Sequence, residues 1–373
     1  MLRDIIFFSL VTAVLFLIHA TVYGVSARAF IYELSYWYLW LLVPSVAFVA
    51  AFFAVKKSHH YFFAYFFILI ASWVGTVFIL LCASLIYEMI RLIGGDQPVM
   101  LAVLLAVAVA LSLYALWNGY RVVVRSYRIV LPNLTQPKRV IHLSDLHIGV
   151  VRQSGYLERV VKKCNELKPD VVLISGDLFD GSVPTYEDML HPLDVLMAPC
   201  YLSHGNHELY EGFDRVREII SSTKVVLLED RMVDVGDVSI IGVTYRQNAS
   251  ESMLGEVLDS LSLDHTLNHS LDHSKTTILL SHEPTQWDDA RRRGIDLMLS
   301  GHTHNGQIVP FNLLIKIFYP YTVGLYEKDS HYLHVSPGTG TWGPPMRFGS
   351  HNQITLLDLV PAEVHNDIQP SAS

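Results

Sequence analysis

The sequence predicts a helical membrane bundle followed by a layered α/β domain, and two observations support this division. The first 120 residues hold only five basic and four acidic side chains among mostly apolar and aromatic ones. From Lys138 onward, short β-branched runs alternate with amphipathic helical stretches, the pattern of a layered α/β domain. We therefore expect a transmembrane domain over residues 1–120, an α/β domain over residues 138–360 and a tail over residues 361–373.

Four apolar stretches account for the membrane part. A spanning helix needs about 20 predominantly apolar residues, and each stretch approaches or exceeds that length. The stretches are residues 5–23, 36–55, 61–90 and 98–119. Arg3 precedes the first of them, but three more spans follow and no A-x-A-like cleavage site precedes a soluble domain, which favours an anchor over a signal peptide. The sequence therefore predicts an integral, multi-pass membrane protein with an all-α bundle of four helices.

The orientation follows from the basic residues that flank these stretches. Six of them share the side that holds the N-terminus and the segment after residue 119, namely Arg3, Lys56, Lys57, Arg121, Arg125 and Arg128. Only Arg28 and Arg91 lie on the other side. Because basic flanks stay cytoplasmic, we expect the C-terminal domain on the cytoplasmic side of the plasma (inner) membrane.

Residues 121–137 are expected to form a basic juxtamembrane linker. Its charges suit anionic lipid headgroups, although the positive-inside signal alone also accounts for them. The lipid bilayer is in either case an expected partner.

The overall charge argues against a nucleic-acid partner. The chain carries 27 basic and 35 acidic residues, a formal net charge of −8. Phosphate backbones bind clustered basic surfaces, and none is evident. The spacing of the three cysteines indicates neither a disulfide framework nor a zinc knuckle, and nothing in the sequence indicates an oligomeric state.

The α/β part has an expected order of elements. Strands are predicted near residues 138–143, 170–175, 199–203, 232–235, 238–243, 276–281, 296–300, 331–336 and 353–359. Helices are predicted near residues 154–168, 185–197, 212–222, 250–262 and 285–293.

Five of the expected strands end in polar residues. The clusters are Asp145-x-His147, Gly176-Asp177-x-x-Asp180, Gly205-Asn206-His207-Glu208, His282 and Gly301-His302-Thr303-His304. In open α/β sheets the ligand lies outside the carboxyl ends of the strands. We therefore expect these five clusters to converge on one site.

The residue types in these clusters are those that hold divalent ions. Asp145 and His147 are two apart, as are His302 and His304, so each pair can point the same way from an extended backbone. Asp177 offers two oxygens on a glycine turn and suits a bridge between ions. Carboxylates, imidazoles and the Asn206 amide, with no thiolate, suit Mn, Fe or Zn better than Ca or Cu(I).

Together these motifs resemble the calcineurin-like metallophosphoesterase superfamily, over roughly residues 138–360. The resemblance implies a four-layer α/β/β/α sandwich with two central mixed sheets. It implies two divalent ions, one held by Asp145, His147, Asp177 and His304, the other by Asp177, Asn206, His282 and His302. It also implies that His207 lies near the scissile phosphate as the catalytic side chain.

The expected activity is that of a membrane-anchored hydrolase of phosphodiesters or phosphomonoesters. Two ions can clamp the attacking and leaving oxygens, and a metal-bound hydroxide can attack phosphorus near neutral pH. A histidine that binds no metal can protonate the leaving oxygen. Asp180 stands where purple acid phosphatases carry a metal-binding Tyr, so a ferric-tyrosinate centre is disfavoured.

The segment after the last metal motif is distinctive. Residues 336–349 resemble the branch that includes membrane-associated bacterial phosphodiesterases, some compared with enzymes that hydrolyse UDP-diacylglucosamine. A lipid-linked or nucleotide-sugar-lipid substrate would fit this branch. Arg347 is a candidate for substrate binding, through a second phosphate or a glycerol-type headgroup, and pairing with an acidic neighbour is the alternative. The apolar run from Ile308 to Tyr326 is either a rim facing the bilayer or a buried covering segment.

Two functions of other classes remain open. The chain could be a membrane transporter, or a scaffold, with a regulatory phosphoesterase-like domain. Glu88 is the one acidic residue within the four apolar stretches and lies near a helix end, whereas intramembrane ionisable groups usually mark a transport pathway. The complete set of seven ligands with His207 argues against a degenerate scaffold.

Overall fold

The computed structural model divides into two compact units. The structure describes residues 2–58, 60–181, 187–247, 253–263 and 274–362. The membrane unit comprises Met1–Tyr120 and Gly343–Phe348, and the α/β unit comprises Arg121–Trp342 and Gly349–Ser373. The expected tail lies outside the described residues from residue 363 onward.

Four long helices build the membrane unit. They are α1 (Leu2–Phe30), α2 (Trp37–Lys57), α3 (Tyr61–Gly94) and α4 (Pro98–Tyr120). All four are long and apolar enough to cross a membrane. The expected all-α bundle of four helices is therefore confirmed, and each helix extends at one or both ends beyond the apolar stretch that predicted it.

The segment Gly343–Phe348 belongs to the membrane unit although it lies far along the chain. The backbone N–H of Arg347 donates to the carbonyl of Ala115, at 2.9 Å, and the Asn118 amide donates to the carbonyl of Arg347, also at 2.9 Å. A Cβ on Gly119 would collide with the backbone of Pro345, so this glycine permits the close approach. The segment thus packs on the last turns of α4.

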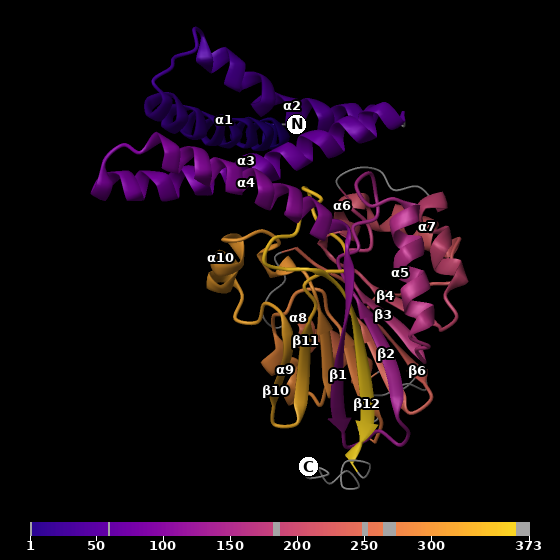
Figure 1. Cartoon of the computed structure of the whole chain (residues 1–373). Helices are drawn as coiled ribbons and strands as arrows, with labels where there is room; N and C mark the ends of the chain where they lie inside the picture. Colours follow the sequence, from indigo (N-terminus) through magenta and orange to yellow (C-terminus); the bar gives the residue numbers. More distant parts are fainter. Residues whose placement is uncertain (1, 59, 182–186, 248–252, 264–273, 363–373) are drawn as a thin grey trace. The chain divides into compact units, whose positions relative to one another are not determined.

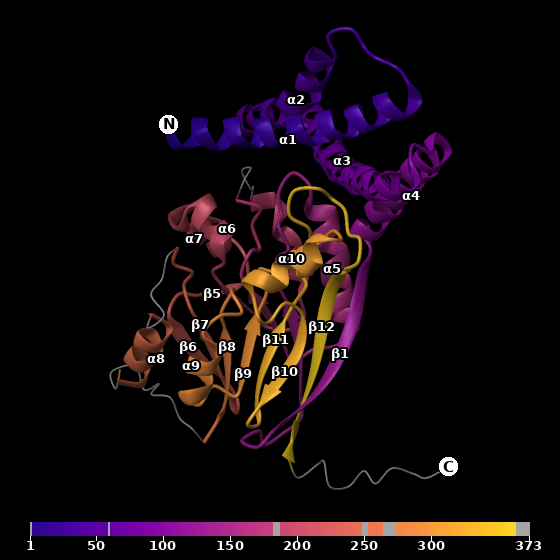
Figure 2. The same cartoon turned by 90° about the vertical axis from the view of Figure 1, so that its left-hand side faces the viewer.

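Two six-stranded mixed sheets form the centre of the α/β unit (Figure 2). The first has the order β1-β12-β2-β3-β4-β5 and the second the order β10-β11-β9-β8-β7-β6. The strands of the first sheet are β1 (Val122–Leu131), β2 (Lys138–Leu143), β3 (Val171–Ser175), β4 (Cys200–Ser203), β5 (Val226–Leu228) and β12 (Asn352–Pro361). Those of the second are β6 (Arg231–Val235), β7 (Val238–Gly242), β8 (Thr276–Leu280), β9 (Leu297–Ser300), β10 (Gly324–Lys328) and β11 (His331–Val335).

The central strands of each sheet run in parallel. In the first sheet β2, β3, β4 and β5 are parallel neighbours, and in the second β7, β8, β9 and β11 are. Antiparallel pairing occurs between β12 and β2, between β6 and β7, and between β10 and β11. Since parallel strands end at the same edge, each sheet gathers the loops that follow its central strands on one side.

Helices cover the outer faces of the sheets (Figure 1). On the first sheet these are α5 (Ser154–Glu166) and α7 (Phe213–Ser221), with 3₁₀ turns at Glu187–Met189 and His191–Val195, whereas the short α6 (Asn206–Glu211) lies at the strand ends, after β4. On the second they are α8 (Met253–Leu263) and α9 (Trp287–Arg292), and α10 (Phe311–Phe318) follows β9.

Three apolar cores separate four layers. In β3 the side chains alternate, so that Val172 and Ile174 pack with the helices on the first sheet, whereas Val171 and Leu173 face the second sheet. In β8, Ile278 likewise lies between the sheets. A third core joins the second sheet to α8 and α9. This arrangement confirms the predicted α/β/β/α sandwich.

Several elements differ from the expected ones. Residues 121–137, expected as a basic linker, contain the ten-residue strand β1, which pairs along its whole length with β12. Arg125 and Arg128 lie on the exposed part of β1, so basic side chains suited to a linker are also compatible with an edge strand. The expected helix over residues 185–197 has two 3₁₀ turns in its described part, where Pro192 limits helical hydrogen bonding.

Candidate metal centre

Polar side chains from both sheets meet at the carboxyl ends of their strands. Asp145 and His147 follow β2, Asp177 follows β3, and Asn206 follows β4, all in the first sheet. His282 follows β8, and His302 and His304 follow β9, in the second sheet. Short distances join all seven predicted ligands into one cluster, which consists of two groups.

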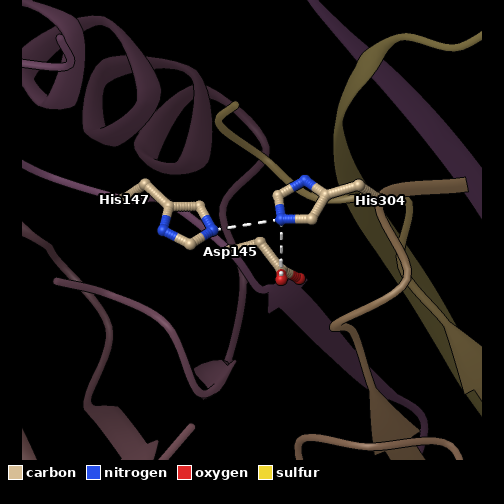
Figure 3. A group of neighbouring side chains, drawn as sticks. All are labelled: Asp145, His147 and His304. Carbon is tan, nitrogen blue, oxygen red and sulfur yellow. Dashed lines mark hydrogen bonds and ion pairs between the residues drawn. The ribbon is translucent and has the colours of Figure 1, made fainter. Parts of the chain in front are cut away.

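The first group consists of Asp145, His147 and His304 (Figure 3). The Nε2 atoms of the two imidazoles lie 3.1 Å apart, and His304 Nε2 lies 3.3 Å from Asp145 Oδ1. Asp145 and His147 are almost completely buried, whereas the side chain of His304 is 12% exposed. One ligand atom from each residue therefore points to a common position.

The second group consists of Asp177, His282 and His302. His282 Nε2 lies 3.1 Å from Asp177 Oδ2, and the Nδ1 atom of the same imidazole lies 2.8 Å from the carbonyl of Ser175. His302 Nδ1 lies 3.0 Å from Asn206 Oδ1. The Asn206 amide oxygen thereby adjoins this second group.

Asp177 lies between the two groups. Its Oδ2 atom is 3.1 Å from His282 Nε2 and 3.8 Å from His147 Nε2. Its Oδ1 atom accepts a hydrogen bond from the backbone N–H of His207, at 2.9 Å, which fixes the orientation of the carboxylate. One oxygen is thus available to both positions.

These residues fit two divalent ions. Bonds of about 2.0–2.2 Å to one ion place neighbouring ligand atoms roughly 3–4 Å apart, and the distances within each group lie close to this range. Two imidazole nitrogens that face each other beside a carboxylate direct two lone pairs, or two protons, at the same point, and these repel. A cation bound at that point removes the repulsion. Nitrogen and oxygen donors without a thiolate match ions such as Mn, Fe or Zn.

The protonation of the second group also matches a cation site. Burial opposes charge here, but the His282 and His207 imidazoles hold the pKa of Asp177 below its ordinary value. Against the same burial, Asp177 raises the pKa of His282 to about 10. A proton shared by this pair occupies the position that a divalent ion would take, so metal binding should release it.

The backbone at the site is strained. Positive φ angles, which only glycine adopts freely, occur at five of the seven predicted ligands: Asp145, His147, Asp177, His302 and His304, with values from 48° to 69°. Such strain costs about 1–3 kcal/mol per residue and persists where the surroundings enforce it. Its concentration here indicates that side-chain position at this site takes precedence over local backbone preference.

A buried carboxylate supports this backbone. Glu208 Oε2 accepts hydrogen bonds from the N–H groups of Asp177 and Gly205, at 2.9 and 2.6 Å. Its Oε1 atom accepts from Leu178 and Phe179, at 2.8 and 3.2 Å. Sequence reasoning assigned no role to Glu208, although a glutamate three residues after the N-cap Gly205 can supply the carboxylate half of a capping box, by accepting from the N-cap N–H.

His207 lies beside both groups. Its Nδ1 atom bonds to the backbone carbonyl of Asp180, and its Nε2 atom lies 4.0 Å from Asp177 Oδ2. Its ring centroid lies 4.5 Å from that of His147. His147, Asp180 and His207 also form a third group able to hold an ion, so both a catalytic role and a ligand role are compatible with the position of His207.

Another residue that the sequence did not indicate is Tyr319. Its hydroxyl lies 2.9 Å from His302 Nε2, and this contact orients the imidazole so that Nδ1 faces Asn206. No periodicity or motif marks Tyr319, because its role arises from the fold of the loop after β9. Glu283 is also near, with Oε1 3.6 Å from His302 Nε2.

A cavity of about 420 Å³ borders the second group. His282 and Glu283 belong to its lining, together with Tyr245, Arg246 and the buried His204. Burial lowers the pKa of His204 to about 4, so this imidazole is neutral near pH 7. The cavity therefore offers neutral hydrogen-bonding groups, the Glu283 carboxylate and the Arg246 guanidinium, which is paired with Asp230, next to the centre.

The predicted substrate residue Arg347 belongs to the membrane unit. Its side chain is completely buried, and its backbone bonds to α4 as described above. Its predicted contact with substrate stays a prediction.

Comparisons with known proteins agree with these motifs. The family model described as calcineurin-like phosphoesterase matches residues 138–306. An uncharacterized metallophosphoesterase of Helicobacter pylori is 32% identical over 255 residues, which cover 66% of this chain and 67% of that protein. A Danio rerio protein named as a transmembrane protein with metallophosphoesterase domain is 32% identical over 244 residues, 61% of this chain and 54% of that protein.

A solved structure of a dimetal phosphatase from Danio rerio overlaps with a TM-score of 0.34 at 13% identity, covering 54% of this chain and 87% of that chain. The assignment rests on the sequence matches rather than on this overlap. By those matches, the chain belongs to the calcineurin-like metallophosphoesterase family.

Proposed function

We propose that this protein is a membrane-anchored phosphoesterase that uses two divalent ions to hydrolyse a phosphodiester or phosphomonoester. The observation that supports this most directly is the position of Asp177 between two groups of ligands. One carboxylate within reach of both positions is the arrangement that a two-ion centre requires.

Different side chains are proposed to bind the ions and to donate the proton. When bound, the ions would neutralise phosphoryl oxygens and make hydroxide available near neutral pH. Asp145, His147, Asp177 and His304 would hold one ion, and Asp177, Asn206, His282 and His302 the other. The carbonyl of Asp180 accepts from Nδ1–H and fixes the His207 ring, so that Nε2 faces the centre. In its doubly protonated, imidazolium form the ring would donate the Nε2 proton to the leaving oxygen.

We further propose an amphiphilic substrate, lipid-linked or nucleotide-sugar-lipid in kind. Four membrane helices in the same chain favour a substrate located at the bilayer. The polar cavity beside His282 is suited to the part of the substrate that is not hydrolysed. On the sequence of residues 336–349 alone, Arg347 is proposed to contact a second phosphate or headgroup.

The catalytic side of the membrane is proposed to be cytoplasmic, at the plasma (inner) membrane. The support is the excess of basic flanking residues, six against two. A fluorescent protein fused after Ser373 should be bright and an alkaline phosphatase fused there should be inactive. The reverse pattern would place the centre on the other side without affecting the metal ligands.

The activity is tested with detergent-solubilised protein treated with EDTA. Hydrolysis of an aryl phosphodiester should disappear on metal removal and return with Mn²⁺. A panel that adds phospholipids and nucleotide sugars would then narrow the substrate. Full activity without metal would exclude the two-ion proposal, and metal binding without hydrolysis of any ester would favour a scaffold.

A further inference from the structure

Helix α10, Phe311–Phe318, exposes an apolar surface. Five of its eight side chains are large and apolar and are between 46% and 74% exposed: Phe311, Leu313, Leu314, Ile317 and Phe318. None of the helix residues is buried. Other exposed large apolar residues described in the α/β unit, such as Val195 and Met197, do not form such a helical cluster. An exposed apolar patch of this kind marks an interaction site.

Hydrogen bonds attach the segment just before α10 to the points where the chain passes between the units. The Gln307 side chain pairs with the backbone of Trp342, with both N···O distances at 3.0 Å. The Ser350 hydroxyl donates to the carbonyl of Gln307, at 3.0 Å. Trp342 is the last residue before Gly343–Phe348, and Gly349 follows that segment. Chain connectivity thus ties the α10 region to the unit that carries the membrane spans.

A second connection between the units is equally short. Tyr120 ends α4 and Val122 begins β1, so only Arg121 separates them. The α/β unit is therefore bound to the membrane spans at two places without a long linker.

The other end of α10 reaches the metal centre. Tyr319 directly follows the helix, and its hydroxyl holds the His302 imidazole at 2.9 Å. Thr303, between the two histidines of the same motif, donates to the carbonyl of Thr322, at 2.6 Å. Figure 2 shows α10 beside the ends of the strands of the second sheet. One short helix thus joins an exposed apolar surface to a ligand of the centre.

We propose that α10 is an interfacial helix that inserts its apolar side chains into the bilayer spanned by α1–α4, and that it brings the metal centre to phosphate esters at the membrane surface. Lys316 on the same helix suits the headgroup region of that interface, with its anionic lipids. The insertion stands on the exposure and connectivity of α10, whereas the role in substrate access rests on the proposed phosphoesterase function.

The insertion is tested by depth measurement in nanodiscs of equal parts phosphatidylcholine and phosphatidylglycerol. A nitroxide label is placed at Ile317→Cys or, as the matched control, at Met197→Cys, in a Cys82→Ser background, since Cys164 and Cys200 are buried. We expect oxygen to relax the Ile317 label more than a water-soluble nickel complex does, and the reverse at Met197. Equal behaviour of the two labels would overturn the proposal. Protection of the Ile317 label from both agents, as a second copy or a protein partner would produce, would also overturn it.

The role in substrate access is tested with two substrates that share one reacting group. Hexadecyl p-nitrophenyl phosphate enters bilayers, whereas ethyl p-nitrophenyl phosphate stays in water. The double variant Ile317→Gln/Phe318→Gln should reduce the hexadecyl-to-ethyl ratio of kcat/KM by roughly tenfold, because apolar contact with the bilayer is lost. The control Val195→Gln/Met197→Gln should keep the wild-type ratio.

An unchanged ratio in the α10 variant would contradict the role in substrate access. Absence of hydrolysis of both esters in wild type, with metal bound, would instead count against the proposed function. The depth measurement would then still decide whether α10 enters the bilayer.

Discussion

The two sheets of the α/β unit contribute different proposed ligands to one centre. The first supplies both carboxylates, the Asn206 amide and one histidine, whereas the second supplies only histidines. Each group of ligands contains residues from both sheets. Neither sheet therefore carries a complete site, and the centre depends on how the sheets pack.

The two sets of ligands also differ in surroundings. Asp145 and Asp177 are buried and their backbone is held by internal hydrogen bonds, some of them to Glu208. On the second sheet, the side chains of His302 and His304 are 22% and 12% exposed, whereas that of His282 is buried. The difference indicates that the first sheet provides fixed negative charge, while the two histidines after β9 lie on the solvent side of the site.

The largest expected effect comes from the residue that serves both groups. Asp177→Ala should abolish activity and remove both ions, because the shared oxygen is lost. Asp177→Asn keeps an acceptor for the His207 N–H but removes the negative charge, and it should likewise abolish activity and remove both ions. Metal content by mass spectrometry and aryl phosphodiester turnover measure this. Asp214→Asn, at a fully exposed carboxylate, is the matched control. Loss of only one ion would show that Asp177 belongs to one group.

The next effect separates the two groups. His304→Ala should remove the ion of the first group, and His282→Ala that of the second, each leaving the other ion in place. Both variants should lose most activity, since the two ions act together. Metal stoichiometry after dialysis distinguishes them. If either variant lost both ions, the groups would have to be treated as one cooperative site.

A smaller effect is expected at His207, which comes from the first sheet but is proposed to bind no metal. His207→Ala should lower kcat by roughly 10²–10⁴, the usual contribution of a positioned acid–base group. Metal content should stay near that of wild type. A variant that lost an ion would instead identify His207 as a ligand, consistent with the third group that it forms with His147 and Asp180.

The smallest effect concerns a contact between the sheets away from the metal ligands. The Nδ1 atoms of His142 on β2 and His334 on β11 lie 2.8 Å apart, and both residues are fully buried. Burial lowers the pKa of His334 to about 3 and, with the neighbouring imidazole, holds that of His142 well below its ordinary value.

Both groups are therefore neutral when folded but take up protons below about pH 6.5 when unfolded. Their contribution to stability is complete above that pH and is lost as the pH falls towards 3, by about 1.4 kcal/mol per pH unit for each histidine. His334→Gln should reduce the pH slope of the free energy of unfolding accordingly. Urea unfolding of metal-free protein between pH 6.5 and 4.5 measures it, with the exposed His191→Gln as control. An unchanged slope would show that His334 does not titrate in this way.

The sequence by itself determined the four apolar helices, and it identified the seven polar residues that gather at the candidate centre. Local sequence patterns are sufficient to predict these features. Spans follow from runs of apolar residues, and ligands follow from polar residues placed directly after apolar strands. Parallel strands then bring their ends to one edge whatever the details of the loops.

Only the tertiary structure decided which residues support that centre and where the chain is exposed. β1 was expected as a linker because basic residues suit a linker as well as an edge strand. Its pairing with β12, which identifies it as a strand, joins residues more than 200 positions apart. Tyr319 holds His302 only because α10 turns the chain back towards β9. The apolar residues of α10 are compatible with either burial or exposure, because hydrophobicity alone does not determine whether a side chain contacts the protein core or lies on the surface. Contacts between distant segments, rather than local patterns, determine each of these features.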